Sequence, residues 1–340
     1  MGKKGVLLVN LGTPDSPSTA DVRKYLAEFL MDGRVIDVPY PLRALLVRGI
    51  IVPFRGPKSA KTYRAIWSEN GSPLMHYSVR SAELLKERLG DDYHVELAMR
   101  YQSPSIQSAL NKLKAAKVDS IQVIPLFPQY ASATTGSIHD KVMEIVRTWQ
   151  TIPSISFLNS FYDDEGMVKN FAENGKKYHP ETFDHVLFSF HGLPQRHLRK
   201  GDDSKQHCLK VDKCCETITE NNKFCYSAQC YRTAQLIATE LGIPKEKYTI
   251  TFQSRLGRDP WAQPYTSEVI EHLAEHGAKN ILVFCPAFVA DCLETIFEIA
   301  EEYQEEFVEA GGEKIQLVES LNDHPMWIDT LERLVKTPIN

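Results

Sequence analysis

With 340 residues, of which 43% are hydrophobic and 24% charged, the chain has globular composition and enough length for two domains. This composition excludes a disordered or fibrous protein. The formal net charge of -5, from 39 basic and 44 acidic residues, lacks the basic excess that binds a phosphate backbone, which argues against nucleic acid as a partner.

The N-terminal residues predict a cytoplasmic protein. The first apolar run, Val6–Val9, ends at Asn10 and is too short for the core of a signal peptide. The longest apolar run elsewhere, Leu45–Phe54, is interrupted by Arg48 and is far shorter than the ~20 residues that span a bilayer. We therefore expect no transmembrane segment, while peripheral contact with a membrane and the oligomeric state stay open.

Eight short runs with the composition of β-strands alternate with longer segments of helical pattern. In chain order these runs cover residues 6–10, 94–99, 120–125, 154–158, 186–190, 248–252, 280–284 and 315–318. Alternation of this kind predicts parallel strands with helices on both faces of the sheet. Eight strands divide evenly into two sets of four.

An internal repeat supports that division. Val6–Pro14 parallels Val186–Pro194, since each is an apolar strand followed by a Gly-x-Pro turn, and residues 123–127 parallel residues 284–288 in the same order. Chance similarity between buried strands is the alternative, because Gly-x-Pro turns are common.

The predicted fold is therefore α/β, with two similar doubly wound domains, each built on a four-stranded parallel sheet flanked by helices. The expected domains are residues 1–158 and residues 159–318. A C-terminal helix within 319–340 is expected to pack back on the first domain.

His191 is the first candidate for chemistry. Ligands of doubly wound sheets bind beyond the carboxyl ends of the strands, and His191 directly follows the strand predicted at 186–190. The first half of the repeat has Leu11 at this position, so the chemistry is expected in the second half. A neutral imidazole there can accept a proton or bind a metal. A satisfied histidine at a strand end is the alternative.

The second candidate is an acidic helical run that opens at Glu294. Its 3.6-residue period places apolar residues on one face, namely Ile296, Ile299, Ala300, Tyr303 and Phe307. Glutamates fall on the opposite face, namely Glu294, Glu298, Glu302 and Glu305. A solvated acidic face is the alternative, and it is the expectation for Glu305, Glu306 and Glu309. Glu294 and Glu298 lie near the helix N-terminus, where the dipole favours a carboxylate.

Five segments resemble bacterial protoporphyrin ferrochelatases in their order and spacing, and the resemblance covers nearly the whole chain. They are Asn10–Pro14, Pro128–Ser137, Ser189–Pro194, Phe252–Trp261 and Cys285–Glu298. The resemblance implies a lyase of haem biosynthesis that inserts Fe(II) into protoporphyrin IX, forming protohaem and releasing two protons.

The resemblance also implies roles for particular residues. His191 and Glu294 would be the catalytic pair that handles iron across the macrocycle, and Glu298 and Glu302 would extend an acidic path for the metal.

Four further residues would surround the porphyrin by the same resemblance: Leu11, Arg100, Tyr101 and Phe288. The alternatives are core positions for Leu11 and Phe288, a surface ion pair for Arg100, and packing for Tyr101. Residues 34–67, a mixture of apolar and basic side chains, resemble one lip of the family's pocket, or else form a helix that packs on its own domain.

Five of the seven cysteines crowd into residues 201–230, an insertion relative to simpler bacterial members of the family: Cys208, Cys214, Cys215, Cys225 and Cys230. Without a secretory signal, such crowding predicts metal or cluster chemistry before disulfides. Some ferrochelatases carry a 2Fe-2S cluster, and we expect one here on four of these five thiolates. A zinc site assisted by His207 and a reduced structural thiol group are the alternatives. Cys285 and Cys292 are expected to be buried thiols.

Three rival functions remain for comparison. A coproporphyrin III ferrochelatase would share the fold and the His–Glu pair. A solute-binding protein or a non-catalytic haem or porphyrin carrier could share two similar domains, but the missing export signal and the acidic residues argue against them. A dinucleotide-dependent dehydrogenase is disfavoured because no G-x-G-x-x-G follows a predicted strand.

Overall fold

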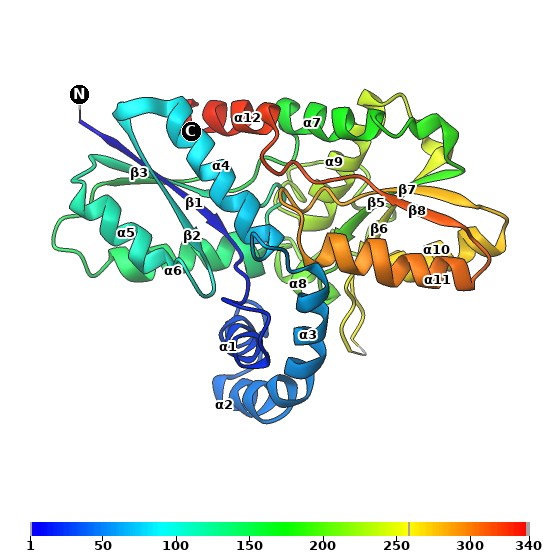
Figure 1. Cartoon of the computed structure of the whole chain (residues 1–340), viewed down its shortest axis with the longest axis horizontal. Coiled ribbons are helices and arrows are strands. Elements are labelled where there is room, and N and C mark those ends of the chain that lie inside the picture. Colours follow the sequence, from blue (N-terminus) through cyan, green and yellow to red (C-terminus); the bar gives the residue numbers. More distant parts are fainter. Residues whose placement is uncertain (1, 258, 338–340) are drawn as a thin grey trace. The chain divides into compact units, whose positions relative to one another are not determined.

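The computed structural model describes residues 2–257 and 259–337, and the chain divides into two compact units (Figure 1). Unit 1 comprises the chain up to Phe127, Ala131–Ser160 and the chain from Asp323 onward. Unit 2 comprises Pro128–Tyr130 and Phe161–Asn322.

Unit 1 is built on a four-stranded parallel sheet in the order β2-β1-β3-β4. Its strands are β1 (Lys4–Asn10), β2 (Tyr93–Met99), β3 (Ser120–Pro125) and β4 (Ser154–Phe157). Its helices are α1 (Thr19–Leu30), α2 (Tyr40–Ala44), η1 (Leu45–Ile51), α3 (Val52–Ile66), α4 (Pro73–Leu89), η2 (Gly90–Asp92), α5 (Ile106–Ala115), η3 (Ser132–Gly136), α6 (Ser137–Val146) and α12 (Pro325–Lys336).

Unit 2 repeats this plan with the order β6-β5-β7-β8, again all parallel. Its strands are β5 (His185–His191), β6 (Tyr248–Gln253), β7 (Asn280–Phe284) and β8 (Lys314–Leu317). Its helices are α7 (Glu165–Lys176), η4 (Pro180–Thr182), α8 (Gln195–Lys200), α9 (Tyr226–Glu240), η5 (Lys245–Lys247), α10 (Thr266–Glu275), η6 (Leu293–Tyr303) and α11 (Gln304–Glu309). The predicted fold class, two doubly wound four-stranded sheets, is confirmed.

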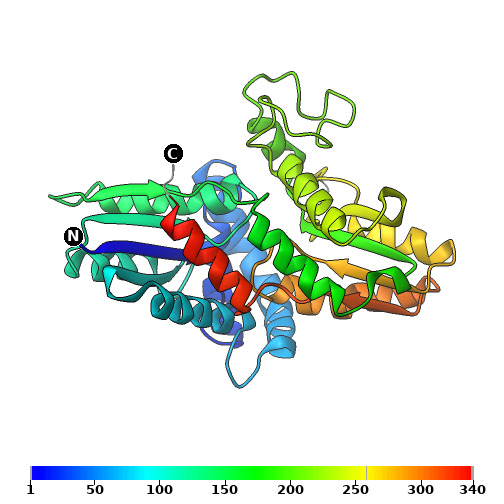
Figure 2. The same cartoon turned by 90° about the horizontal axis from the view of Figure 1, so that it is seen from above.

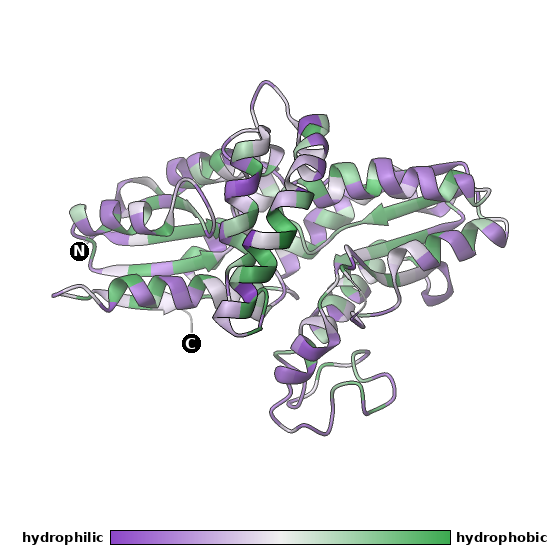
Figure 3. Ribbon diagram, turned by 90° about the horizontal axis from the view of Figure 1, so that it is seen from below, coloured by the Kyte–Doolittle hydropathy of each residue, from purple (hydrophilic) through white to green (hydrophobic). Residues whose placement is uncertain are grey.

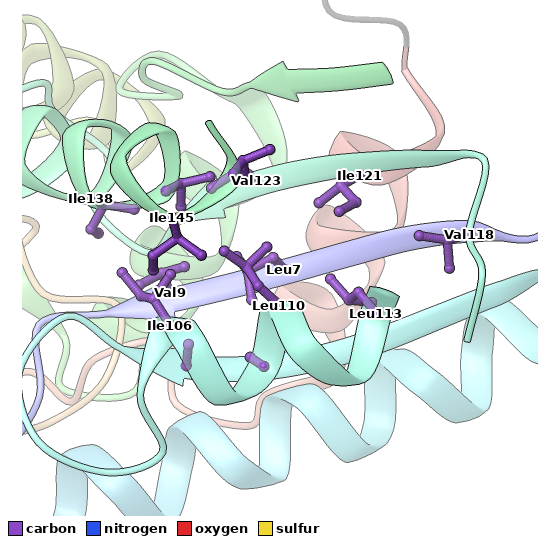
Figure 4. Packing of buried hydrophobic residues seen from close by; sticks show 14 of the residues in the cluster. Leu7, Val9, Ile106, Leu110, Leu113, Val118, Ile121, Val123, Ile138 and Ile145 are labelled. Carbon is purple, nitrogen blue, oxygen red and sulfur yellow. The ribbon is translucent and has the colours of Figure 1, made fainter. Parts of the chain in front are cut away.

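The strands are apolar along most of their length because helices cover both faces of each sheet (Figure 3). In unit 1, residues of β1 and β3 pack against α5 and α6, as Figure 4 shows for Leu7, Val123, Leu110 and Ile145. Burial of such a cluster supplies most of the stabilisation of a domain, at roughly 25 cal/mol for each Å² of apolar surface removed from water.

The Gly-x-Pro turns of the repeat have a steric cause. Gly12 has φ +114°, and a Cβ atom there would lie 2.1 Å from the carbonyl oxygen of Tyr101. A Cβ atom at Gly192 would lie 2.9 Å from the carbonyl oxygen of Gln253. In both units a glycine after the first strand therefore lets the chain pass close to its neighbour.

The C-terminal helix α12 belongs to unit 1, where it packs on α4 (Figure 1, red). An ion pair between Arg88 and Asp329 joins the two helices. Among the described residues, no helix combines the length and the hydropathy that a membrane crossing requires.

Candidate active site

The carboxyl ends of β5 and β6 place the first site residues. His191 is the last residue of β5 and lies opposite Gln253, the last residue of β6. Glu294 is the second residue of η6, the helix that follows the neighbouring strand β7. This is the edge of a doubly wound sheet at which ligands bind.

The hydrogen bonds of His191 determine which ring nitrogen is free to react. Its Nδ1 atom lies 2.7 Å from the carbonyl oxygen of Gly192. Because a carbonyl oxygen only accepts hydrogen bonds, Nδ1 carries the proton in the neutral ring, and Nε2 presents its lone pair. The half-buried imidazole can therefore take a proton or bind Fe(II) through Nε2.

Gln253 joins the strand that carries His191 to the helix that carries the glutamates. Its backbone carbonyl accepts from the Gly192 N–H at 2.8 Å, and its buried carboxamide donates to the Glu294 carbonyl at 2.7 Å. The same Nε2 atom lies 3.3 Å from the Glu298 carboxylate. Gln253 lies within the sequence motif Phe252–Trp261, but the sequence pattern predicts no role for this residue. Its position as a polar residue at the end of an apolar strand is the signal that could have identified Gln253.

Glu298 lies at this same edge and shares an electrostatic environment with both predicted catalytic residues. Ser254 donates to its carboxylate at 2.6 Å and Tyr303 donates at 3.1 Å. Burial raises the pKa of Glu298 above the ordinary value of 4.5, and the charge of Glu294 acts in the same direction. The Ser254 hydrogen bond and His191 oppose this shift. Glu294, Glu298 and His191 thus form one interacting group.

The helix that carries these glutamates differs from the predicted α-helix. Residues Leu293–Tyr303 form a π-helix, in which hydrogen bonds join residues five positions apart. The predicted division into an apolar and an acidic face is therefore wrong at Glu298, whose carboxylate bonds Tyr303, five positions ahead. Ala300, expected on the apolar face, is exposed. Long π-helices are rare, and π-helical turns occur frequently at functional sites.

Asp291 fixes the beginning of η6. Its buried carboxylate accepts from the Thr295 hydroxyl at 3.0 Å and from the Asn322 side chain at 2.7 Å. These bonds hold the first turn, on which Glu294 lies half-buried. Cys285 and Cys292 are buried thiols, as predicted, and burial raises the pKa of each.

The outer glutamates lie farther along the same helix. Glu302 is exposed on η6. Burial, followed by the charge of Glu302, raises the pKa of Glu306, so the acidic side chains of this region interact. An acidic path through Glu302 stays a prediction.

The predicted porphyrin residues of unit 1 have contacts of their own. Arg100 forms an ion pair with Asp32 at 2.7 Å, and the hydroxyl of Tyr101 donates to the same carboxylate at 2.9 Å. Tyr101 is buried and Leu11 is half-buried. The Arg100 ion pair is largely buried, with 14% of the Arg100 side chain exposed, so it differs from the surface ion pair of the alternative. Tyr101 has the contacts of the packing alternative, and a role in binding porphyrin stays a prediction for all three residues.

In unit 2, Phe288 is partly buried and packs against the hydrophobic core of the unit. Its ring therefore has the contacts of the core alternative, and a contact with porphyrin stays a prediction.

The cysteine-rich segment before α9 forms a loop without helix or strand (Figure 2). Four thiols gather there. The Sγ atoms of Cys214 and Cys215 are 3.7 Å apart, and the side chain of Cys225 interacts with those of Cys208 and Cys215. The fifth cysteine, Cys230, is fully buried on α9.

A cavity of about 580 Å³ lies beside these four thiols. None of the seven cysteines forms a disulfide. Among the described residues, no three His, Cys, Asp or Glu side chains are arranged to hold a single metal ion.

Replacing Glu298 with glutamine is expected to change how stability depends on pH. The pKa of Glu298 is raised in the folded chain, so its contribution to stability is present below the ordinary value of 4.5 and is lost as pH rises. Urea unfolding at about pH 5 and about pH 8 should show the wild-type free energy of unfolding falling relative to that of Glu298→Gln at the higher pH. An equal difference at both pH values would contradict this assignment.

Comparison with known proteins places the chain in a family. The family model described as Ferrochelatase matches residues 3–338. A relative from Legionella pneumophila (strain Corby) named Ferrochelatase is 45% identical over 338 residues, which are 99% of this chain and 100% of that protein. A relative of the same name from Ectopseudomonas mendocina (strain ymp) is 46% identical over 335 residues, or 98% of each chain.

A solved structure supports the fold. SirB from Bacillus subtilis with Fe3+ is similar with a TM-score of 0.50 and 14% identity, over 98% of this chain and 94% of that one. Together with the confirmed resemblance of the sequence motifs, the family model and the relatives show that the chain belongs to the ferrochelatase family.

Proposed function

We propose that this chain is a porphyrin metal chelatase that inserts Fe(II) into protoporphyrin IX, releasing two protons and forming protohaem. The observation that carries the proposal is the group formed by His191, Glu294 and Glu298 at one sheet edge. In this group the main-chain carbonyl of Gly192 binds Nδ1 of His191 and leaves Nε2 to react. Family membership supports the same reaction.

The chemistry requires a proton acceptor and weak metal ligands in one place. Two pyrrole protons must leave while Fe(II) loses its water, and each step is faster when the acceptor is already positioned. Imidazole and carboxylate are suitable Fe(II) ligands that can also release the ion. His191 and Glu294 are therefore the residues proposed to handle the metal and the protons.

Glu298 is proposed to pass protons outward. Because burial raises its pKa, it is a stronger proton acceptor than an exposed glutamate. Its carboxylate contacts the hydroxyls of Ser254 and Tyr303, which lie on different segments of the chain. Both hydroxyls can relay a proton away from the metal.

An anaerobic assay with Fe(II) tests the reaction and its substrate. We expect turnover with protoporphyrin IX to exceed turnover with coproporphyrin III under identical conditions. The reverse order would make the chain a coproporphyrin III ferrochelatase. Porphyrin binding without metal insertion would indicate a carrier.

We further propose that a 2Fe-2S cluster is held by Cys208, Cys214, Cys215 and Cys225. The four thiols gather in one loop, and four thiolates, two on each iron, are the ligand set of a 2Fe-2S cluster. Cys225 is the N-cap of α9, where backbone N–H groups favour a thiolate. Such a cluster supplies one-electron redox chemistry when bound. Cys230 is proposed as the cysteine outside this set.

Anaerobically purified protein tests the cluster. We expect visible absorption with about two irons per chain. Cys225→Ser should abolish the absorption, and Cys230→Ala should retain it. Colourless protein with stoichiometric zinc would contradict the cluster and favour the zinc alternative.

Peripheral contact with a membrane from the cytoplasm is also proposed, through the segment 40–58. It exposes apolar side chains, with Phe54 78% exposed and Leu45 67% exposed. Arg48 and Lys58 are exposed on the same segment. Apolar and basic side chains together favour an anionic lipid surface.

Sedimentation with lipid vesicles tests this contact. Wild-type protein is expected to sediment with phosphatidylserine-containing vesicles more than with phosphatidylcholine vesicles. The double variant Leu45→Ser, Phe54→Ser should lose this binding, while Val308→Ser, at a residue 49% exposed on α11, should keep it. Equal binding by both variants would remove this segment from membrane contact.

A further inference from the structure

We infer that Tyr226 is a positioning residue for the active-site histidine and that it couples His191 to the cysteine-rich segment. The expected effect on turnover rests on the proposed function. The expected effect on the position of His191 does not depend on that function. It assigns a role to two buried side chains, Tyr226 and Cys230, which the reaction itself does not use.

The first step is the contact with His191. Tyr226 is the first residue of α9 and is 8% exposed. Its hydroxyl donates to the main-chain carbonyl oxygen of His191 at 2.8 Å. His191 ends β5, so this bond restrains the chain at the point where it leaves the sheet. The restraint acts on the main chain beside the reacting imidazole, whose Nδ1 is held separately by Gly192.

The second step is the contact with Cys230. Cys230 lies one turn farther along α9, is fully buried, and its side chain interacts with that of Tyr226. The Tyr226 hydroxyl donates to the His191 carbonyl oxygen. The buried side chain of the fifth cysteine therefore lies beside Tyr226 and restrains its ring.

The third step connects this pair to the other cysteines. Cys225 immediately precedes Tyr226 at the N-cap position of α9, where its carbonyl oxygen accepts from the Gln229 N–H at 3.0 Å. Its side chain also contacts Cys208 and Cys215. The backbone of the first turn of α9 therefore follows the arrangement of the thiol group. Tyr226 transmits a shift of that turn to the carbonyl of His191 through one hydrogen bond.

Tyr226→Phe tests the positioning role, with Tyr231→Phe as the matched control. Tyr231 lies on the same helix, and its pKa is raised to about 12 by burial and by nearby thiols, so the control makes the same change close to the cysteines. For Tyr226→Phe we expect kcat for metal insertion to fall about three- to tenfold, the effect of one hydrogen bond, with an unchanged KM for protoporphyrin. The ring ¹⁵N signals of His191, assigned with His191→Gln, should move in Tyr226→Phe and stay in place in Tyr231→Phe.

Cys225→Ser tests the coupling. In the wild-type background this variant should displace the His191 ring signals. In the Tyr226→Phe background it should displace them by less than half as much. The inference would be overturned if Cys225→Ser displaced the His191 signals equally in both backgrounds. It would also be overturned if Tyr226→Phe and Tyr231→Phe had the same His191 signals and the same kcat. If the wild-type chain inserts no metal but the His191 signals change as expected, the proposed function alone would be rejected.

Discussion

His191→Ala is expected to lower the rate of Fe(II) insertion by about 10³-fold, within the range that positioned acid–base groups supply. The variant loses the Nε2 lone pair that can take a pyrrole proton or bind the metal. Porphyrin binding should persist, because most of the binding energy of a large flat ligand comes from apolar contact. Anaerobic initial rates and fluorescence titration with protoporphyrin IX measure the two quantities separately.

His185→Ala is the matched control for this experiment. His185 begins the same strand that His191 ends, and its Nε2 atom bonds the Thr249 hydroxyl at 2.8 Å. The control removes an imidazole at the opposite end of β5, so kcat should stay near the wild-type value. Near-normal turnover by His191→Ala would exclude His191 from the mechanism.

Glu294→Gln is expected to lower kcat by about 10²-fold, because it removes a negative charge that stabilises Fe(II) while the metal enters the porphyrin. Glutamine keeps the size of the side chain, so the first turn of η6, fixed by Asp291 and Thr295, should be preserved. Initial rates over a range of Fe(II) concentrations, with porphyrin saturating, measure kcat and the KM for the metal.

Glu301→Gln supplies the control for the loss of charge. Glu301 is exposed on the same π-helix, and its replacement changes the net charge by the same amount. We expect wild-type kcat for this variant. Equal losses in Glu294→Gln and Glu301→Gln would indicate that general electrostatic attraction, rather than a contact at Glu294, governs the rate.

The sequence was sufficient for the architecture because the fold is repeated within it. The two Gly-x-Pro turns mark equivalent strand ends. Each glycine is required because the backbone of a neighbouring segment of the same chain lies too close for a Cβ atom. Strands buried on both faces are also continuous apolar runs, which single them out from helices. The positions of β1 and β5, and with them His191, follow from these local signals.

The surroundings of the site were not predictable because they depend on contacts distant in sequence. The 3.6-residue pattern placed Glu298 opposite Tyr303, whereas the π-helix joins them by a hydrogen bond. The partner of Arg100 is Asp32, 68 positions earlier, and no local pattern connects them. Likewise, the spacing of five cysteines does not reveal that Cys230 lies in the core while the other four gather in the loop.

A single anaerobic turnover with stoichiometric Fe(II) and protoporphyrin IX, in weak buffer with a pH indicator, tests the central claim most directly. The wild-type chain should form haem and release two protons for each porphyrin metallated. The double variant His191→Ala, Glu294→Gln should bind the porphyrin but form haem no faster than the uncatalysed reaction. Haem formation by the double variant at the wild-type rate would contradict the assignment of the reaction to this pair.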